Sequence, residues 1–416
     1  MGKVKAKGNG EGTVFERPDR PGVFRAVFSY NDPETNEPKR KTFDRPSKRE
    51  ALAAGRKWVE QLGSGLLPDA DKITLWQWLE RWLADYVKPK VRTKSYAKSE
   101  SCLRLYIKPY LGNSLMIKIK SPDVQRVFNR LMVDGGEETV KIIDDKEVRE
   151  KKGVSTGTVR VTRRYLIMAL DQAVRVGLLT KNVIKETEPP KLVKQEIHPL
   201  NKEQAAALTA AAKAAADSAK KARTVKESAY MAILLGLGSG MRLGEIFGLK
   251  WDCVDLEKGI IYVKRALETG QTKKIFLDPK TPKSRRQIPL PVDVAKELRS
   301  YKKRQDWYKH LLGDKWEDND LVITNQFGRV LDTGNFTNRE FKKLLCEAGI
   351  NKPVKFHDLR HSHATMLLLA GVHPKIVSER LGHSTVQMTL DTYSHLLPDT
   401  QETAARALDG LFASSK

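Results

Sequence analysis

Residues 356–365 read Phe-His-Asp-Leu-Arg-His-Ser-His-Ala-Thr, and soon after them come Leu-Gly-His-Ser at 381–384 and Asp-Thr-Tyr-Ser-His at 391–395. His357 and Arg360 are three positions apart, a helical spacing that puts two hydrogen-bond donors on one face. A lone tyrosine, Tyr393, follows His383 by ten positions. Imidazoles, a guanidinium group and a phenol without a carboxylate cluster suit a phosphodiester better than a peptide or a sugar.

Two stretches upstream carry further cationic side chains. A predicted apolar helix ends at the glycine-rich residues 238–240 and is followed by Arg242 and Glu245. Glycines before an arginine let the backbone turn, and a glutamate three residues on could orient the guanidinium group. The second stretch, residues 278–289, is a basic turn that leads into a strand. Taken alone, the first pattern is more often a surface ion pair and the second a solvated loop.

Composition favours a polyanionic partner. The 416 residues are enough for two or three domains, and 75 Lys and Arg against 51 Asp and Glu give a formal net charge of +24. Such an excess points to nucleic acid. The three cysteines form no CxxC pair, so we expect free thiols and neither disulfides nor a zinc site. The N-terminus is no signal peptide and no apolar run can cross a bilayer, so we expect a cytoplasmic protein.

The pattern along the chain predicts a multidomain, mainly α-helical protein with small antiparallel sheets. In residues 1–65, three short alternating segments precede a helical pattern at 47–62. We expect a three-stranded sheet backed by one helix, with exposed Arg and Lys. Such a sheet can lie in a major groove of DNA, and the alternative is a solubilising accessory domain.

Residues 72–188 have helical periodicity, with apolar side chains at three- and four-residue steps. We expect an all-helical domain that includes helices at 94–107, 121–131 and 156–176, and we interpret the charged stretch 137–152 as a flexible loop. Two prolines after residue 188 indicate a linker.

Residues 196–416 combine helical patterns with strand-like segments at 260–263 and 286–290. An alanine-rich helix is expected at 205–222, because alanine has the highest helix propensity. The composition predicts a mixed α+β domain that is mainly helical around one small antiparallel sheet.

Together these motifs resemble the tyrosine recombinases, the phage integrase family. The resemblance covers about residues 198–400 and rests on order and spacing of the motifs Gly-Met-Arg-Leu-Gly-Glu, Lys-Thr before Ile-Pro-Leu, His-Asp-Leu-Arg-His, Leu-Gly-His-Ser and Thr-Tyr-Ser-His. It implies a catalytic domain at 196–416, a helical core-type DNA-binding domain at 72–188 and an arm-type DNA-binding domain at 1–65. Three-domain integrases of temperate phages and integrative elements have this arrangement.

The resemblance implies a site-specific recombinase that integrates and excises a mobile element by cutting and rejoining DNA through a 3′-phosphotyrosine intermediate. Tyr393 would be the nucleophile, and covalent capture would conserve the energy of the phosphodiester bond. Arg242 and Arg360 would clamp the non-bridging oxygens, because planar guanidinium groups match phosphate geometry.

Three further side chains complete the implied site. His357 would be the general acid/base near the tyrosine oxygen, and His383 would donate a hydrogen bond to the phosphate. Lys280 would protonate the departing 5′-oxygen, with Lys283 near enough to compete. No metal or cofactor would be required, since cationic side chains supply the charge. The histidines at 361, 363 and 395 have no convincing metal-ligand spacing, and we assign the first two structural or supporting roles.

The resemblance also implies partners. These are double-stranded DNA attachment sites, a homotetramer on DNA, and possible contributions from a host DNA-bending protein and an excision factor, with no membrane partner. The apolar pattern at 403–412 predicts a short helix that needs a surface, either on a neighbouring protomer or on its own domain. Two rival functions stay open: a type IB topoisomerase-like enzyme, and a non-catalytic DNA-binding accessory or regulator.

Overall fold

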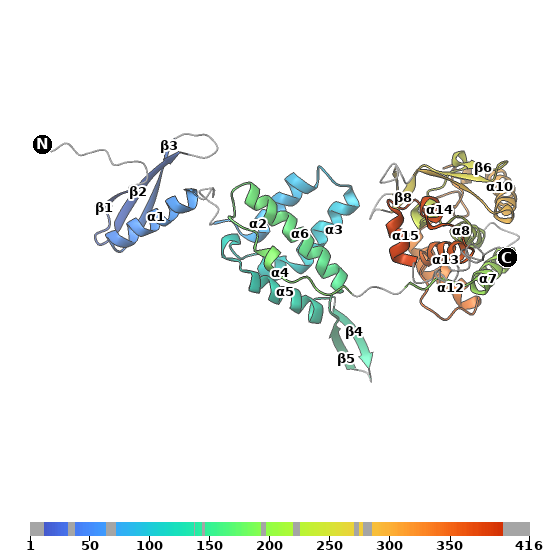
Figure 1. Ribbon diagram of the computed structural model, residues 1–416, viewed down its shortest axis with the longest axis horizontal. Coiled ribbons are helices and arrows are strands. Elements are labelled where there is room, and N and C mark those ends of the chain that lie inside the picture. The colour runs from blue at the N-terminus through green and yellow to red at the C-terminus, as the bar shows by residue number, and fades with distance from the viewer. Residues whose placement is uncertain are drawn as a thin grey trace, which may run out of the picture. The chain divides into compact units, whose positions relative to one another are not determined.

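The computed structural model describes residues 12–31, 38–63, 72–136, 138–143, 146–192, 197–218, 225–269, 274–277 and 285–393. The chain separates into two compact units, residues 1–194 and 195–416 (Figure 1). Both are mainly helical with small antiparallel sheets, which confirms the predicted fold class. Among the described helices, none combines the length and apolar character needed to cross a membrane.

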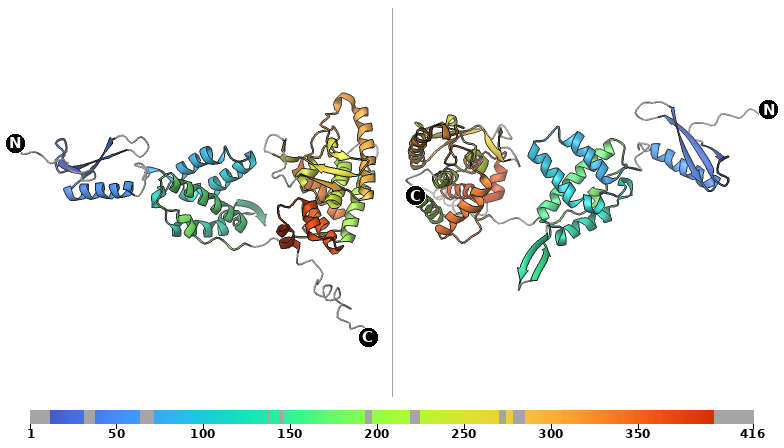
Figure 2. Two further views of the ribbon diagram at one scale, coloured as in Figure 1. Left: turned by 45° about the horizontal axis from the view of Figure 1, so that its top comes forward. Right: turned by 180° about the vertical axis from the view of Figure 1, so that it is seen from behind.

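The first unit begins with an antiparallel sheet in the order β1-β2-β3, followed by a helix: β1 (Thr13–Glu16), β2 (Phe24–Asn31), β3 (Pro38–Arg45) and α1 (Lys48–Gly63). The helix runs along one face of the sheet (Figure 2). Alternate residues of the strands point to that face, so Ala26 and Phe28 pack against Ala51 and Trp58 of the helix. The predicted three strands and helix are confirmed.

The rest of the first unit contains α2 (Leu75–Trp82), η2 (Leu83–Val87), α3 (Thr93–Tyr106), α4 (Lys108–Leu111), η3 (Met116–Lys118), α5 (Ser121–Asp134), α6 (Thr156–Arg175) and η4 (Val183–Glu186). Thr74 starts α2 through a capping box with Gln77, in which each residue bonds the other's backbone N–H. Trp78 on the buried face of α2 donates from Nε1 to the carbonyl oxygen of Ala169, at 2.9 Å, which ties α2 to α6. The predicted helices are observed here.

One expectation for this unit is wrong. The charged stretch that we interpreted as a loop forms an antiparallel hairpin of β4 (Glu138–Ile143) and β5 (Lys146–Lys151) (Figure 1). Its base is closed by a hydrogen bond from the Gly136 nitrogen to the Lys152 oxygen, at 2.8 Å. The high charge of this stretch hid its Thr, Val and Ile residues, which favour strands.

The helices and helical turns of the second unit are α7 (Lys202–Asp217), α8 (Val225–Ser239), α9 (Leu243–Phe247), η5 (Trp251–Cys253), α10 (Val292–Leu312), η7 (Gly313–Lys315), α11 (Thr333–Asn335), η8 (Phe336–Glu340), α12 (Phe341–Glu347), α13 (Asp358–Leu369), α14 (Pro374–Leu381) and α15 (Val386–Tyr393). The apolar α8 is buried nearly all round and contacts α7, α9, α10 and α13. The sequence analysis did not anticipate α15.

The strands of this unit form a three-stranded sheet and a separate hairpin, where the sequence predicted one sheet. The sheet has the order β10-β7-β6, from β10 (Arg286–Pro289), β7 (Ile260–Val263) and β6 (Val254–Asp255). The hairpin pairs β8 (Ala266–Thr269) with β9 (Lys274–Leu277). Four predicted features lie outside the described residues, namely Lys280, Lys283, His395 and the segment 403–412.

Candidate active site

One cavity in the second unit brings together five of the six predicted site residues. It has a volume of about 410 Å³ and is lined by Arg242, His357, Arg360, His361, His383, Met388, Asp391, Thr392 and Tyr393. The side chains come from the start of α9, from α13, from the end of α14 and from α15. The sixth predicted residue, Lys280, is not among the described residues.

A glycine turn between α8 and α9 places Arg242. Gly240 has φ of 67°, and a Cβ atom at this position would lie 2.6 Å from the His363 ring, so only glycine fits. Beyond the turn, Arg242 Nη1 donates to Glu245 Oε1 at 2.9 Å. Its Nη2 donates to the Gly382 oxygen at 3.1 Å. The expectation that Glu245 orients Arg242 is therefore confirmed.

Arg360 lies in the first turn of α13 and is 3% exposed. Its Nη1 donates to the carbonyl oxygen of Gly240 at 2.8 Å. Nη2 is buried and has no hydrogen-bond partner within the described part of the chain. Burial is the main cause that lowers the pKa of Arg360 to about 9, and the charge of Arg242 is the second cause. A buried N–H donor without a partner is costly, and an anion in the cavity would satisfy it.

His383 is presented by the end of α14. Gly382 adopts the left-handed conformation, with φ of 68°, and the His383 nitrogen donates back to the Ser378 oxygen at 3.0 Å. Nδ1 of the imidazole lies 2.8 Å from Thr389 Oγ1, which fixes the ring. Burial and the neighbouring Arg360 lower the pKa of His383 to about 4, so the ring is neutral near pH 7.

Tyr393 is the last residue of α15 and is 1% exposed. Its phenol oxygen lies 2.6 Å from Nδ1 of His361. Burial raises the pKa of Tyr393 to about 12, so the phenol keeps its proton at neutral pH. A phenol in this state is a weak nucleophile until a base accepts that proton.

His357 precedes α13 and is exposed at the rim of the cavity. Desolvation of the ring by the surrounding protein atoms, and next the charge of the nearby His361, lower the pKa of His357 below its usual value. Its ring centroid lies 5.0 Å from that of His361 in an edge-on arrangement. Among the described contacts, the imidazole that meets the tyrosine oxygen is therefore His361 and not His357.

Sequence analysis missed two arginines that support the cavity. Arg286 of β10 bonds Glu245 behind Arg242, and its Nε donates to the Arg380 oxygen at 2.7 Å. Arg380 of α14 donates to His363 Nε2 at 3.0 Å. The signal for Arg286 was its place just before the Ile-Pro-Leu strand, where we considered only the lysines.

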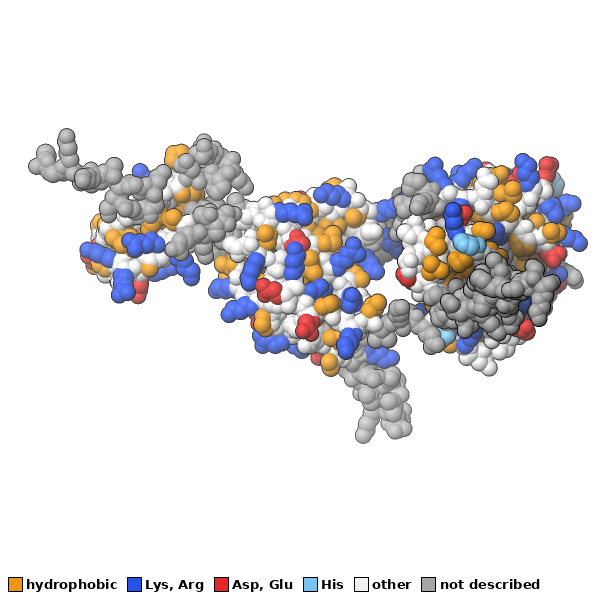
Figure 3. Space-filling view, viewed as in Figure 1, with side chains coloured by type: hydrophobic (Ala, Val, Ile, Leu, Met, Phe, Trp, Pro, Cys, Tyr) orange, Lys and Arg blue, Asp and Glu red, His pale blue; other side chains and the backbone are white. Residues whose placement is uncertain are grey.

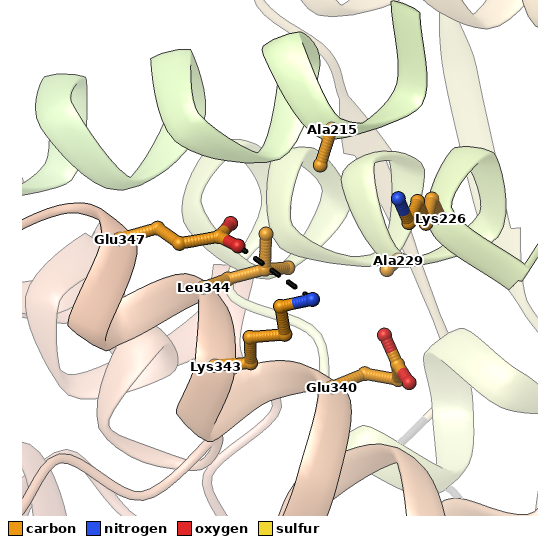
Figure 4. A pocket seen from close by; sticks show the side chains of 7 residues that line it. All are labelled: Ala215, Lys226, Ala229, Glu340, Lys343, Leu344 and Glu347. Atoms are coloured by element: carbon orange, nitrogen blue, oxygen red, sulfur yellow. Dashed lines mark ion pairs between the residues drawn. The ribbon is translucent and has the colours of Figure 1, made fainter. Parts of the chain in front are cut away.

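A second hollow in the same unit is much smaller. It lies between α7, α8 and the η8–α12 segment and is lined by Ala215, Lys226, Ala229, Glu340, Lys343, Leu344 and Glu347 (Figure 4). Its volume is about 20 Å³, which is room for about one water molecule. We place the candidate active site in the cavity of about 410 Å³, because five of the predicted site residues line it. Within the described ranges, no three His, Cys, Asp or Glu side chains form a metal-binding group.

Comparison with known proteins identifies the fold. The Tn1549 transposon integrase bound to circular intermediate DNA superposes with a TM-score of 0.64 at 20% identity, over 81% of this chain and all of that one. The lambda integrase in a tetramer bound to a Holliday junction gives 0.54 at 18% identity, over 95% and 97% of the two chains. The fold is therefore that of the tyrosine recombinases.

Sequence comparison gives the family. The phage integrase family model matches residues 191–399, and a model of the phage integrase N-terminal SAM-like domain matches residues 74–132. A tyrosine recombinase XerC-like protein of Caldanaerobacter subterraneus is 28% identical over 409 residues, which cover 94% of this chain and 96% of the relative. The chain belongs to the phage integrase family, and it is a site-specific tyrosine recombinase.

Proposed function

We propose that Tyr393 attacks the scissile phosphate and forms a 3′-phosphotyrosyl bond, while the 5′-oxygen leaves as a hydroxyl. The observation that carries this proposal is the cavity in which Tyr393 shares the wall with two guanidinium groups and three imidazoles. Rejoining reverses the step, since the 5′-hydroxyl of a strand attacks the phosphotyrosine and releases Tyr393.

Arg242 and Arg360 hold the phosphate in this proposal. The buried, unpartnered Nη2 of Arg360 supports the assignment, because it is a donor fixed in place before the substrate binds. Both guanidinium groups are held by backbone oxygens, those of Gly240 and Gly382. Donors that are already oriented stabilise the charge of a pentacoordinate transition state without further reorganisation.

The other predicted residues have catalytic roles beside the two arginines. His383, held by Thr389, donates to a phosphate oxygen, and His357 at the rim is the acid/base candidate that its place in the motif implies. Lys280 protonates the departing 5′-oxygen, with Lys283 as the competing candidate. The support for the lysine is its place in the Lys-Thr turn before β10.

The substrate is double-stranded DNA, and both units contribute to its binding. The net charge of +24 supports this proposal, and Figure 3 shows Lys and Arg side chains spread over the face of both units that it displays. Residues 1–65 would bind arm-type sites, residues 72–188 core-type sites, and residues 196–416 would bind and cut the core. Relatives that are named as an ICEBs1 integrase of Bacillus subtilis and a prophage integrase of Escherichia coli support the integration and excision of a mobile element.

The active assembly in this proposal is a homotetramer on DNA, in which residues 403–412 dock on a neighbouring protomer. The structurally similar lambda integrase forms a tetramer on a Holliday junction, which supports an assembly of four protomers. A chain that ends at Pro398 tests the docking. It should bind a single DNA site normally but lose cooperative assembly on a Holliday junction in native gels. Normal assembly would show that the segment packs on its own domain. A host bending protein and an excision factor would be added to such assays.

A suicide substrate tests the reaction. The full chain is incubated with a nicked core-site duplex whose short 5′-hydroxyl fragment diffuses away, which traps the covalent adduct. We expect a denaturation-stable adduct that maps to Tyr393, and Tyr393→Phe should bind the same duplex without forming it. An adduct in Tyr393→Phe would overturn the assignment. Relaxation of any supercoiled plasmid without recombinant products would instead favour a topoisomerase, and DNA binding without cleavage an accessory factor.

A further inference from the structure

We propose that His361 is the general base that removes the proton from Tyr393 during cleavage, and that it returns the proton when the strand is rejoined. This inference rests on the proposed role of Tyr393 as the nucleophile. It gives a catalytic function to a side chain whose place in the motif suggested only structural support. The contact that carries it is the 2.6 Å separation between Nδ1 of His361 and the phenol oxygen of Tyr393.

The surroundings of the pair restrict the phenol to this partner. Tyr393 is 1% exposed and packs against Ala364, Leu368 and Leu381, so apolar groups cover the ring. Its oxygen has one hydrogen-bond partner among the described side chains, which is His361. Both residues also line the cavity that holds the arginine clamp. A proton that leaves the phenol therefore has an acceptor already in place.

The charge state of the imidazole suits this task. Burial is the main cause of a lowered pKa for His361; Arg360 also lowers it, and Asp358 opposes them. The ring is thus neutral near pH 7 and can accept a proton at Nδ1 when Nε2 carries the hydrogen. The titratable and charged groups that face it are Asp358 and Arg360 on its own helix, His357 just before that helix, Tyr393 and Asp391 on α15, Arg242 before α9, and His383 after α14.

The step balances without a co-reactant. The phenol proton of Tyr393 moves to Nδ1 of His361 as the phenol oxygen forms its bond to phosphorus. The bond between phosphorus and the 5′-oxygen breaks, and that oxygen takes a proton from the acid proposed above, Lys280. In rejoining, the 5′-hydroxyl gives its proton back to the lysine, attacks phosphorus, and Tyr393 leaves with the proton from His361.

The test compares the same substitution at three histidines in the full chain. In His361→Asn, the amide oxygen can keep a hydrogen bond to the phenol but cannot act as a base. His357→Asn tests the rival base, and His373→Asn is the control, since His373 is exposed and caps α14 outside the cavity. We expect single-turnover cleavage of the suicide substrate to fall about 10²- to 10⁴-fold in His361→Asn. The duplex affinity should stay within about threefold of the wild type, and His373→Asn should cleave normally.

Two further measurements separate a base from a packing residue. Wild-type cleavage should slow at acid pH as the imidazole is protonated, and this acid limb should be missing in His361→Asn. A substrate with sulfur in place of the bridging 5′-oxygen has a leaving group that needs no proton. It should restore cleavage in Lys280→Ala but leave His361→Asn slow, because the defect lies on the nucleophile side.

The outcomes are distinct. Full cleavage by His361→Asn, or rescue of that variant by the sulfur substrate, would overturn the role of His361 while the adduct on Tyr393 still supports the proposed function. Failure of the wild type to form that adduct would instead remove the proposed function itself. If His361→Asn is unfolded by circular dichroism, His361→Gln is measured in the same assays with the same criteria.

Discussion

Arg286 and Glu245 form a buried ion pair directly behind Arg242, with Nη2 and Oε2 separated by 2.8 Å and both side chains 6% exposed. Burial alone would raise the pKa of Glu245, but the hydrogen bond from Arg286 and the charges of both arginines hold that pKa below its usual value. The other carboxylate oxygen accepts from Arg242. The pair therefore links β10 to the arginine that lines the cavity.

Glu245→Gln should destabilise the protein strongly. The substitution leaves a buried guanidinium group without its counter-charge, and breaking one partner of such a pair costs about 3–5 kcal/mol. Urea denaturation followed by circular dichroism measures the loss. The matched control is Glu317→Gln, which removes the exposed pair between Glu317 and Arg329 and should cost less than about 1 kcal/mol. Equal effects of the two variants would contradict the prediction.

Arg360→Lys should separate cleavage from binding. A lysine has one ammonium group, so it cannot both bond the Gly240 oxygen and present a second fixed donor to the phosphate. We expect the rate of adduct formation to fall about 10²- to 10³-fold, the typical loss for a transition-state donor. Affinity for the same duplex, measured at the same salt concentration, should change only slightly because many phosphate contacts share it. A parallel loss of affinity and rate would argue that Arg360 acts mainly in binding.

The sequence was sufficient for the parts of the site that depend on local spacing. Glu245 meets Arg242 because three residues separate them at a helix start, and a Gly-rich turn before them was recognisable. The contact between His361 and Tyr393 was not predictable in this way. That contact joins α13 to α15 across 32 positions, and α15 itself was not anticipated. Contacts between helices depend on how the helices pack, which a single sequence does not display.

The same contrast applies to the fold. Helices with an apolar face, such as α2 and α6, were predicted because burial imposes a period on the sequence. The β4–β5 hairpin was misinterpreted because its sequence is rich in charge and offers no apolar face. Arg286 escaped notice for a related reason: a basic residue in a basic turn does not reveal that it is buried against a carboxylate.

Acid should destabilise the protein through His363. This side chain is 5% exposed; its Nδ1 lies 2.6 Å from the Leu237 oxygen and its Nε2 accepts from Arg380. Burial lowers its pKa to about 4 from the usual 6.5. As pH falls, the unfolded chain therefore binds the proton before the folded chain does. The free energy of unfolding keeps its full value above about pH 6.5 and decreases toward pH 4, by up to about 3 kcal/mol.

His363→Asn provides the check on that prediction. The amide keeps a donor for the Leu237 oxygen but cannot titrate, and it leaves the Arg380 donor without its imidazole. We expect a less stable protein at pH 7, by about 1–3 kcal/mol, with a smaller dependence of the unfolding free energy on pH between 6.5 and 4. Denaturation curves at several pH values measure both. An unchanged pH dependence would assign the acid effect to other groups.

The open face of the N-terminal sheet should carry the arm-site contacts proposed for residues 1–65. Ala26 and Phe28 pack under α1, so their neighbours on β2 point to the opposite face, and Ser29 shares that face with its cross-strand partner Arg40. Arg40 is exposed there, whereas Arg56 is exposed on α1. The two arginines therefore test the two sides of one small domain.

Arg40→Ala should weaken binding to a duplex that spans one end of the attachment site, which sequencing of the DNA beside the gene would supply. Loss of one phosphate contact should reduce the slope of log affinity against log salt by about one. Arg56→Ala should leave that slope unchanged. Both variants are made in the Tyr393→Phe background and titrated by fluorescence anisotropy at several salt concentrations. A reduced slope for Arg56→Ala alone would place the DNA on the helix side of the domain. Slopes equal to that of the parent for both variants would remove this domain from DNA binding.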